Sequence, residues 1–313
     1  MTQLLTPKLD LVFKLLFANA PVLLLDLINA VLASPEHLRL RSLDVKNPTI
    51  LPEEDVAKKF IVLDIRAVDE RNRQYDIEMQ VRKYGAYPER SLYYLSKMYT
   101  GQLASGEEYQ TLRPVIGIHF VDYDQFPEHA AWQWAFEVRD ARYPAVRLTD
   151  HLLLHIIELP KFERQVQRQD WGAGLFEWLH FLNHAHKEGE DYMQAQYQHP
   201  AVKQAFRALQ QLSADEETQR RAEIRERALK DEVSLLSEAR KEGREEGIFH
   251  GLLQGIGAML HGKFGEAGSS LAQEAAELHD VNTLQDMMLV IMQATTPEQI
   301  KDYLASQKKS LGN

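Results

Sequence analysis

Residues 60–82 read FIVLDIRAVDERNRQYDIEMQVR, and this stretch decides how we interpret the rest of the chain. Through residues 60–68 and 74–82 the side chains alternate with a period of two, which is the pattern of a β-strand with one buried face. The polar residues 69–73 between them are few enough for the turn of an antiparallel hairpin. A turn centred on Arg71 pairs residues that are equally distant from it, so the sequence predicts Asp64 opposite Glu78.

The predicted register gives the hairpin two unlike faces. One face is almost wholly apolar and carries Ile61, Leu63, Ile65, Ala67, Tyr75, Ile77, Met79 and Val81. The other face carries Val62, Asp64 and Arg66 opposite Gln80, Glu78 and Asp76. Arg66 opposite Asp76 is an ordinary salt-bridging pair. Asp64 and Glu78, however, place two negative side chains about 5 Å apart, which destabilises a sheet. A positive group is therefore expected beside Asp64 and Glu78.

A divalent cation is the economical candidate for that positive group. Mg²⁺ is usually held by one or two carboxylates, keeps several waters and takes further ligands from substrate phosphates. Held by Asp64 and Glu78, the ion would polarise a scissile phosphate and generate a hydroxide, while Gln80 on the same face could orient the attacking water. This hypothesis predicts phosphodiester hydrolysis. The residues alone leave a second interpretation open, in which Asp64 and Glu78 are solvated side chains on the polar face of a hairpin.

Helical patterns precede and follow the hairpin. Thr6 and Pro7 are typical of an N-cap and a first helical residue, and they open a helix with apolar residues at helical spacing. Asp10 and Lys14 share the other face of that helix. Further helices are predicted at residues 21–33, 84–105 (with Pro88 near its start), 172–185 and 200–212, and further strands at 113–123, 132–138 and 151–159.

Residues 214–247 are dominated by charge, with 11 acidic and 8 basic side chains. Such a stretch buries little and predicts a solvated helical connector that marks a domain boundary. Gly243, Gly247, Gly251 and Gly255 recur every four residues and would share one helix face. Because each Gly costs about 1 kcal/mol inside a helix, this spacing predicts either close helix packing or a stretch that is not helical. The remaining residues, 248–313, are predicted to form a small all-helical module.

The composition is that of a folded soluble protein. The 313 residues are 44% hydrophobic and 26% charged and include no Cys, which excludes disulfides, thiolate metal sites and cysteine nucleophiles. A long chain without Cys fits a reducing cytoplasm, and we expect neither a signal peptide nor a membrane span. The formal net charge of −10 argues against a protein that coats nucleic acid through bulk charge. We therefore expect a cytoplasmic protein without a membrane partner.

Four motifs, in this order, resemble the recombination-promoting nuclease (Rpn)/putative transposase family of the PD-(D/E)XK nuclease superfamily. They are KLDLVFKLLF at residues 8–17, VLDIR at 62–66, DIEMQ at 76–80 and YPERSLYY at 87–94. The resemblance covers residues 5–125 well, continues more weakly to about 210 and extends to the charged connector. It implies an α/β fold with a PD-(D/E)XK restriction-endonuclease-like core, in which helices flank a central mixed sheet. The expected domains are a nuclease-like domain at 1–212, the connector at 213–247 and the helical module at 248–313.

The resemblance also assigns roles to residues. It implies that Asp64 and Glu78 are the metal ligands, that Gln80 stands at the usual Lys position and that Asp10 is a further catalytic acid. The expected ion is Mg²⁺, with Mn²⁺ and Ca²⁺ as alternatives. Because Gln lacks the positive charge of Lys, either the metal does more of the electrostatic work or activity is low. Asp10 has an alternative interpretation as an acid in the first turn of its helix, where the helix dipole favours it.

Basic and aromatic residues near the hairpin suggest a DNA-binding surface. Residues 58–97 contain nine Lys or Arg against six acidic residues, in a chain that is acidic overall. Arg90, Tyr94 and Lys97 recur at helical spacing, so one helix face could follow a phosphate backbone, and Lys14 is a fourth candidate. The alternative is a helix packed by its Tyr residues, with its Arg and Lys solvated.

These observations predict a Mg²⁺-dependent DNA endonuclease with little sequence specificity. The resemblance implies a process such as DNA recombination, transposition or defence against foreign DNA. DNA is the expected partner, and the C-terminal helical region is expected to form a homo-oligomer, most simply a dimer. The alternative is a catalytically weak or inactive DNA-associated interaction protein, in which Gln80 marks lost chemistry.

Overall fold

The computed structural model describes residues 4–47, 64–165, 174–278 and 280–310. The chain divides into two compact units, Met1–Leu229 and Lys230–Asn313. The predicted strand residues 60–63, with Ile61, Val62 and Leu63, lie outside the described residues. Each unit has its own buried apolar cluster.

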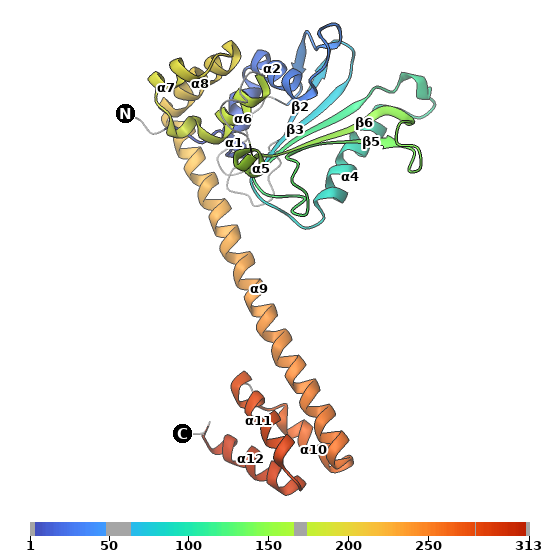
Figure 1. Ribbon diagram of the computed structural model, residues 1–313, viewed down its shortest axis with the longest axis vertical. Helices are drawn as coiled ribbons and strands as arrows, with labels where there is room; N and C mark the ends of the chain where they lie inside the picture. Colours follow the sequence, from blue (N-terminus) through green and yellow to red (C-terminus); the bar gives the residue numbers. More distant parts are fainter. Residues whose placement is uncertain (1–3, 48–63, 166–173, 279, 311–313) are drawn as a thin grey trace. The chain divides into compact units, whose positions relative to one another are not determined.

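A six-stranded mixed sheet forms the centre of the first unit (Figure 1). Its strand order is β1-β2-β3-β4-β6-β5. The strands are β1 (Leu43–Val45), β2 (Ile65–Asp69), β3 (Gln74–Gln80), β4 (Val115–Val121), β5 (Gln133–Arg139) and β6 (Arg147–Glu158). Strand β3 pairs in parallel with β4, and β4 with β6, while β1-β2, β2-β3 and β5-β6 are antiparallel. The expected mixed sheet is confirmed.

The β2–β3 hairpin has the predicted register. Ile65 pairs with Ile77, Arg66 with Asp76, Ala67 with Tyr75 and Val68 with Gln74. Asp64 immediately precedes the first paired residue of β2. The apolar side chains Ile65, Ala67, Tyr75, Ile77 and Met79 are all buried in one core. The opposite face of the hairpin is therefore left for the polar residues, as the alternation predicts.

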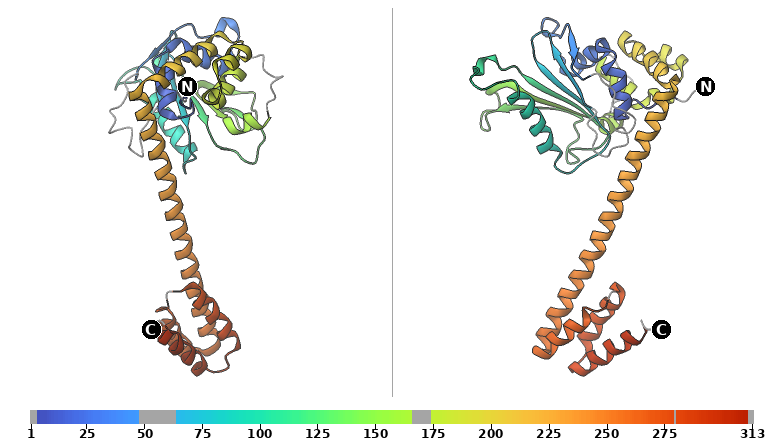
Figure 2. Two further views of the ribbon diagram at one scale, coloured as in Figure 1. Left: turned by 90° about the vertical axis from the view of Figure 1, so that its left-hand side faces the viewer. Right: turned by 180° about the vertical axis from the view of Figure 1, so that it is seen from behind.

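Helices cover both faces of the sheet. The apolar face packs on α1 (Asp10–Ala18), α2 (Pro21–Leu32), α6 (Gly174–His184) and α8 (Pro200–Ala214), which share one core with the hairpin. The crossover from β3 to β4 contains α4 (Tyr87–Thr100), which lies on the other face of the sheet (Figure 2). Leu95 of this helix packs against Gly117 of β4. Pro88 stands at the start of α4, as predicted. The polar face of the hairpin is on the α4 side of the sheet.

Shorter elements complete the first unit. They are η1 (Glu36–Leu38), η2 (Tyr109–Thr111), α5 (Leu159–Gln165), η4 (Ala185–Lys187) and α7 (Glu190–Gln196). The predicted start of the first helix at Thr6 and Pro7 is wrong, because α1 begins at Asp10 with Leu9 as its N-cap. The Leu9 N–H donates to the carbonyl of Thr6 at 3.1 Å, so Thr6 and Pro7 form a turn that leads into the helix.

The second unit is helical throughout its described part. It contains the end of α9 (Glu216–Phe264), α10 (Glu266–Ala275), α11 (Val281–Gln293) and α12 (Pro297–Ser310). Their apolar side chains pack in one cluster, which includes Ile256, Leu260, Leu271, Leu284, Met287, Ile291, Ile300 and Leu304. Gly265, with a positive φ of 58°, separates α9 from α10. Gly268 contacts the Leu260 backbone so closely that no side chain would fit there.

Helix α9 runs without a break through the glycines at positions 243, 247, 251 and 255. The alternative of a non-helical stretch is therefore wrong. A Cβ atom added at Gly243, Gly247 or Gly251 would meet no described atom within 4 Å, so this glycine face lacks a packing partner within the described chain.

The first turns of α9 belong to the core of the first unit. Ala222 and Leu229 are buried there, and the compact unit extends to Leu229, beyond the expected boundary at residue 212. No single helix among the described residues is long and apolar enough to cross a membrane. Helices α1 and α2 satisfy length and composition only as a pair, bent by 109°.

Candidate active site

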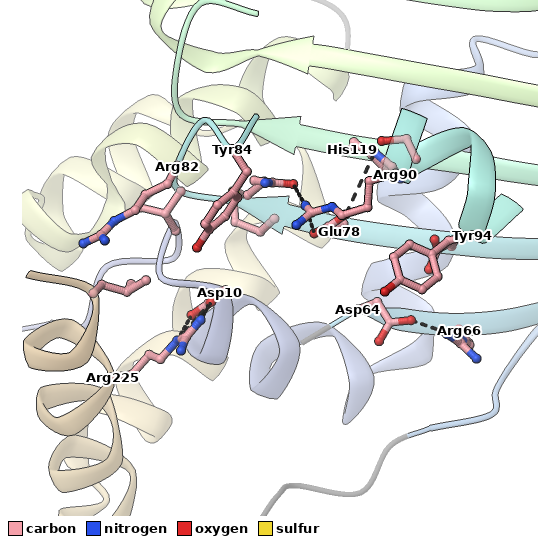
Figure 3. A pocket seen from close by; sticks show the side chains of 16 residues that line it. Asp10, Asp64, Arg66, Glu78, Arg82, Tyr84, Arg90, Tyr94, His119 and Arg225 are labelled. Carbon is pink, nitrogen blue, oxygen red and sulfur yellow. Dashed lines mark hydrogen bonds and ion pairs between the residues drawn. The ribbon is translucent and has the colours of Figure 1, made fainter. Parts of the chain in front are cut away.

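The polar face of the hairpin opens into a pocket of about 220 Å³ (Figure 3). All four predicted catalytic residues line it, and they come from α1, from the start of β2 and from β3. The lining residues are Asp10, Asp64, Arg66, Asp76, Glu78, Met79, Gln80, Val81, Arg82, Tyr84, Arg90, Ser91, Tyr94, His119, Arg225 and Leu229. The structure thus brings together side chains that are as far apart in sequence as Asp10 and Arg225.

Asp64 is held by an arginine on its own strand. The Arg66 Nε donates to Asp64 Oδ2 at 2.8 Å. Arg66 was expected to pair with Asp76, which does lie opposite it in the ladder, but this expectation is corrected because its side chain turns back to Asp64. Arg66 therefore supplies part of the positive charge that was expected beside Asp64 and Glu78.

Asp76 is a buried acid whose carboxylate lacks a full set of hydrogen-bond partners among the described residues. Burial raises the pKa of its carboxyl well above the ordinary value, and the charges of Asp64 and Glu78 raise it further. In the described part of the chain, the Asp76 Oδ1 atom has no hydrogen-bond partner. Asp76 therefore ionises less readily than an exposed Asp, and a cation in the pocket would favour its ionised form.

Glu78 is a second acid of the pocket whose pKa is raised. Burial raises the pKa of its carboxyl to about 7, the Arg90 charge opposes this shift, and the charges of Asp64 and Asp10 add to it. The Arg90 Nη2 lies 3.6 Å from Glu78 Oε1, which is an ion pair without a close hydrogen bond. Close to neutral pH, Glu78 exists in both protonation states.

Arg90 lies inside the pocket, although the sequence placed it on a helix face that follows DNA. Its Nη2 donates to Gln80 Oε1 at 2.8 Å, and its guanidinium lies 5.2 Å from the centre of the Tyr84 ring. The Gln80 Nε2 has no partner among the described residues. Gln80, 3% exposed, is therefore held by its oxygen and offers only its amide N–H groups to a ligand.

The other three predicted DNA-binding residues lie in different surroundings. Tyr94 is 38% exposed and lines the pocket beside Arg66 (Figure 3). Lys97 is exposed on α4 and does not line the pocket. Lys14 is only 5% exposed, and burial lowers the pKa of its ammonium while the charge of Asp64 opposes that change. The Lys14 side chain is therefore largely buried and offers little surface to DNA. Its role in DNA binding stays a prediction.

Asp10 forms a buried ion pair with Arg225 of α9. The Arg225 Nε donates to both carboxylate oxygens of Asp10, at 3.0 and 3.1 Å. Asp10 also accepts a hydrogen bond from the Leu11 N–H at 2.8 Å. The first-turn role of Asp10 and its place in the pocket are therefore compatible, and its charge is already neutralised by Arg225.

Sequence reasoning missed His119, which forms the wall of the pocket beside Glu78. These two residues face each other across the parallel β3–β4 pair. The His119 Nδ1 lies 2.8 Å from the Tyr87 hydroxyl and 4.0 Å from Glu78 Oε2. Burial lowers the pKa of His119 to about 3, so its ring is neutral at pH 7. The signal was the strand predicted at 113–123, but its parallel partner cannot be read from local periodicity.

Comparison with known families decides the classification of the chain. A family model described as PD-(D/E)XK nuclease family transposase matches residues 7–239. The chain belongs to this family. No curated protein and no solved structure matches the chain. The family match confirms the resemblance that the four motifs indicated, and it extends through Arg225 and Leu229 into α9.

Membership of the PD-(D/E)XK nuclease family transposases supports a nuclease or transposase-like function. The α/β core with a mixed sheet agrees with that membership. Asp64 immediately precedes β2, and Glu78, Met79 and Gln80 end β3; the assignment of Gln80 to the usual Lys position stays a prediction from the resemblance.

The side chains of the pocket fit a divalent metal ion of the kind that PD-(D/E)XK nucleases generally use. Among the described residues no group of three His, Asp or Glu side chains is arranged to hold such an ion. Asp64 and Glu78 nevertheless line one pocket beside Asp76, whose Oδ1 lacks a partner. Mg²⁺ needs only one or two protein carboxylates when substrate phosphate and waters complete its shell, so this donor set suffices.

Proposed function

We propose that this protein is a metal-dependent DNA endonuclease that hydrolyses phosphodiester bonds with little sequence specificity. One observation carries the proposal: Asp64, Asp76 and Glu78 share one pocket, in which Asp76 Oδ1 has no partner among the described residues and Glu78 has the Arg90 guanidinium only at 3.6 Å. Acids with strongly shifted pKa values cluster at functional sites, and a bound cation would offset the free-energy cost of burying their charge. Family membership makes a nuclease the fitting class of enzyme.

Asp64 and Glu78 would hold the metal ion, with Mg²⁺ expected and Mn²⁺ or Ca²⁺ as alternatives. When bound, the ion would supply positive charge at the scissile phosphate and lower the pKa of a water. In the reaction, the water oxygen forms a bond to phosphorus while the bond from phosphorus to one bridging oxygen breaks. The water loses one proton and the departing oxygen gains one, so the products are a phosphate monoester and an alcohol.

DNA is the proposed substrate and partner. Arg66, Arg82 and Arg90 line the pocket and provide cations for a phosphate backbone. Leu92 and Tyr93 of α4, 54% and 61% exposed, add apolar surface near the pocket-lining Tyr94. Phosphate contacts carry no sequence information, so a surface of this kind fits binding with little sequence specificity. We further propose that the enzyme acts in the cytoplasm, in DNA rearrangement or in defence against foreign DNA.

Nicking of supercoiled plasmid by the purified full chain tests this function. We expect Mg²⁺- or Mn²⁺-dependent conversion to open-circular and linear DNA, abolished by EDTA and by Asp64→Asn. The matched control is Asp191→Asn, which removes an exposed carboxylate of α7 outside the pocket. The control should cleave as the wild type does.

Isothermal titration with Mg²⁺ or Mn²⁺ provides a measurement that does not depend on turnover. Glu78→Ala should weaken metal binding greatly, because one protein carboxylate then remains from the expected pair. Equal metal binding by Glu78→Ala would contradict the site. DNA binding without cleavage in any of the metals would instead support the alternative, a catalytically inactive DNA-associated protein.

A further inference from the structure

Residue 80 creates a gap in the proposed chemistry. Hydrolysis of a phosphodiester builds negative charge on the reacting phosphate, and enzymes stabilise that charge with fixed positive groups and N–H donors. The resemblance to the PD-(D/E)XK superfamily implies a Lys ammonium at this position, but Gln80 is neutral. Another side chain must provide the charge if the pocket is to act efficiently.

Arg90 places a cation at that position from the neighbouring helix. Its Nη2 is 2.8 Å from Gln80 Oε1 and 3.6 Å from Glu78 Oε1, so it lies beside both residues of the Glu78-Met79-Gln80 motif. A Lys at position 80 would bring its ammonium to the same part of the pocket. The guanidinium is charged at every relevant pH.

The surroundings of Arg90 hold it in place and leave donors available. Its guanidinium lies against the Tyr84 ring, with 5.2 Å between the guanidinium carbon and the ring centre. About a third of its side chain, 36%, is exposed. Because Arg has only donors, Gln80 must turn its oxygen to Arg90. The Gln80 Nε2, which is buried and has no partner in the described chain, then remains as a second donor in the pocket.

We propose that Arg90 is a catalytic residue that, together with Gln80, takes the role of the lysine of the PD-(D/E)XK superfamily motif. This inference rests on the proposed phosphodiester hydrolysis. As the water oxygen bonds to phosphorus and a bridging oxygen departs, the guanidinium and the Gln80 amide donate hydrogen bonds to the non-bridging oxygens. Arg90 transfers no proton: the water proton leaves to solvent, and the departing oxygen takes one from solvent.

Steady-state kinetics on a labelled duplex separates this role from simple DNA binding. Arg90→Gln should lower kcat by about 10²- to 10³-fold and change KM by less than about threefold, because the lost interaction strengthens in the transition state. A backbone contact alone would raise KM and leave kcat unchanged. Arg207→Gln, which removes an exposed Arg of α8 outside the pocket, is the matched control and should leave both constants unchanged.

A charge exchange tests the replacement itself. Gln80→Lys alone should lower activity, because it sets an ammonium within hydrogen-bond distance of the Arg90 guanidinium. Gln80→Lys combined with Arg90→Gln restores one cation, so its kcat should exceed that of Arg90→Gln at least about tenfold. A fully active Gln80→Lys enzyme together with an inactive double variant would overturn the inference.

Binding of inorganic phosphate, measured by titration calorimetry in Mg²⁺, gives a readout without turnover. Arg90→Gln should bind phosphate at least about fivefold more weakly than the wild type, and Arg207→Gln should equal the wild type. If the wild type cleaves no DNA but its phosphate binding depends on Arg90, the proposed function fails and the phosphate contact of Arg90 stands. If the wild type cleaves DNA and Arg90→Gln matches it in both kcat and phosphate binding, this inference fails alone.

Folding is followed by urea unfolding of every variant. Should Arg90→Gln fail to fold, Arg90→Lys decides, because it keeps the charge but loses the planar fork that bonds Gln80. A kcat loss of about tenfold at unchanged KM supports the inference, and an unchanged kcat overturns it.

Discussion

At the scale of single residues, charge compensation in the pocket differs from one carboxylate to the next. Asp64 receives a hydrogen bond from Arg66 at 2.8 Å, whereas Glu78 has the Arg90 guanidinium only at 3.6 Å. Asp76 keeps one carboxylate oxygen without a partner in the described chain. Glu78 and Asp76 are therefore the acids whose ionisation an added cation would favour most, and their protonation should couple to folding.

The free energy of unfolding should depend on pH through Glu78. In the unfolded chain this carboxyl ionises near its ordinary pKa of 4.5, whereas in the folded protein it holds its proton up to about pH 7. Between these values the folded state binds more protons, so the unfolding free energy falls as pH rises. Glu78→Gln, which cannot ionise, should therefore be more stable than the wild type at pH 8 by about 1–3 kcal/mol, at about 1.4 kcal/mol per pKa unit.

Urea unfolding at pH 5 and pH 8, without divalent metal, measures this difference. The gain from Glu78→Gln should fall to less than about 1 kcal/mol at pH 5, because the folded wild type still holds its proton there and the pH is only half a unit above the unfolded pKa of 4.5. Glu89→Gln on the exposed face of α4 is the control and should show no pH-dependent difference. A Glu78→Gln variant less stable than the wild type at pH 8 would show that Glu78 is a stabilising ionised acid.

At the scale of elements, the β2–β3 hairpin was accessible from the sequence because its information is local. The turn length and the period-two alternation determine which residues face each other, so Asp64 and Glu78 were predicted on one face. The side-chain direction of Arg66 could not be predicted, because Asp64 and Asp76 are both within its reach and packing decides between them. Periodicity gives faces and register, while the choice of an ion-pair partner depends on burial.

Helix α9 could not be assigned to the pocket from its composition. Its charge predicts a solvated connector, yet Arg225 and Leu229 are 3% and 7% exposed and line the pocket. Arg225 meets an acid 215 residues earlier in the chain, a separation that no local pattern reports. The sequence nevertheless contained a signal for this buried face of α9, because Ala222, Arg225 and Leu229 recur at helical spacing within the charged stretch.

The Arg225–Asp10 ion pair makes a stability prediction for α9. Arg225→Ala leaves a buried carboxylate without its partner and should lower the unfolding free energy by about 3–5 kcal/mol. Arg227→Ala, on the exposed face of the same helix, should change it by less than about 0.5 kcal/mol. Adding Asp10→Ala to Arg225→Ala should recover part of the loss, because the uncompensated charge is then gone. A double variant as unstable as the sum of the single ones would contradict a direct interaction.

At the scale of the whole molecule, the position of the domain end can be tested by truncation. Residues 213–229 complete the core of the first unit with Ala222 and Leu229 and supply Arg225 to the pocket. A chain ending at residue 239, where the family match ends, should fold and bind metal as the full chain does. A chain ending at residue 212 should unfold at much lower urea and bind metal weakly, whereas equal stability of the two truncated chains would contradict this role of α9.

The glycine face of α9 leads to a prediction about assembly. Gly243, Gly247 and Gly251 meet no described atom that a side chain would displace, and Leu235 and Leu236 are 48% and 59% exposed. Four glycines cost this helix about 4 kcal/mol relative to Ala, and an isolated helix so poor in buried apolar residues is marginal. Packing of two α9 helices around a two-fold axis would offset this cost, so light scattering should give about twice the chain mass of 36.1 kDa.

Substitutions on the glycine face distinguish a face that packs on a second α9 helix from a face that is exposed to solvent. Gly247→Gln raises helix propensity by a few tenths of a kcal/mol or more but inserts a long side chain between close helices, so it should convert the dimer to a monomer. Gly262→Gln, at an equally open position near the end of α9, is the matched control and should keep the dimer mass. The chain ending at residue 239 should be monomeric. If Gly247→Gln kept the wild-type mass and only raised thermal stability, the glycine face would be solvated in the assembled protein, and self-association, if any, would use another surface.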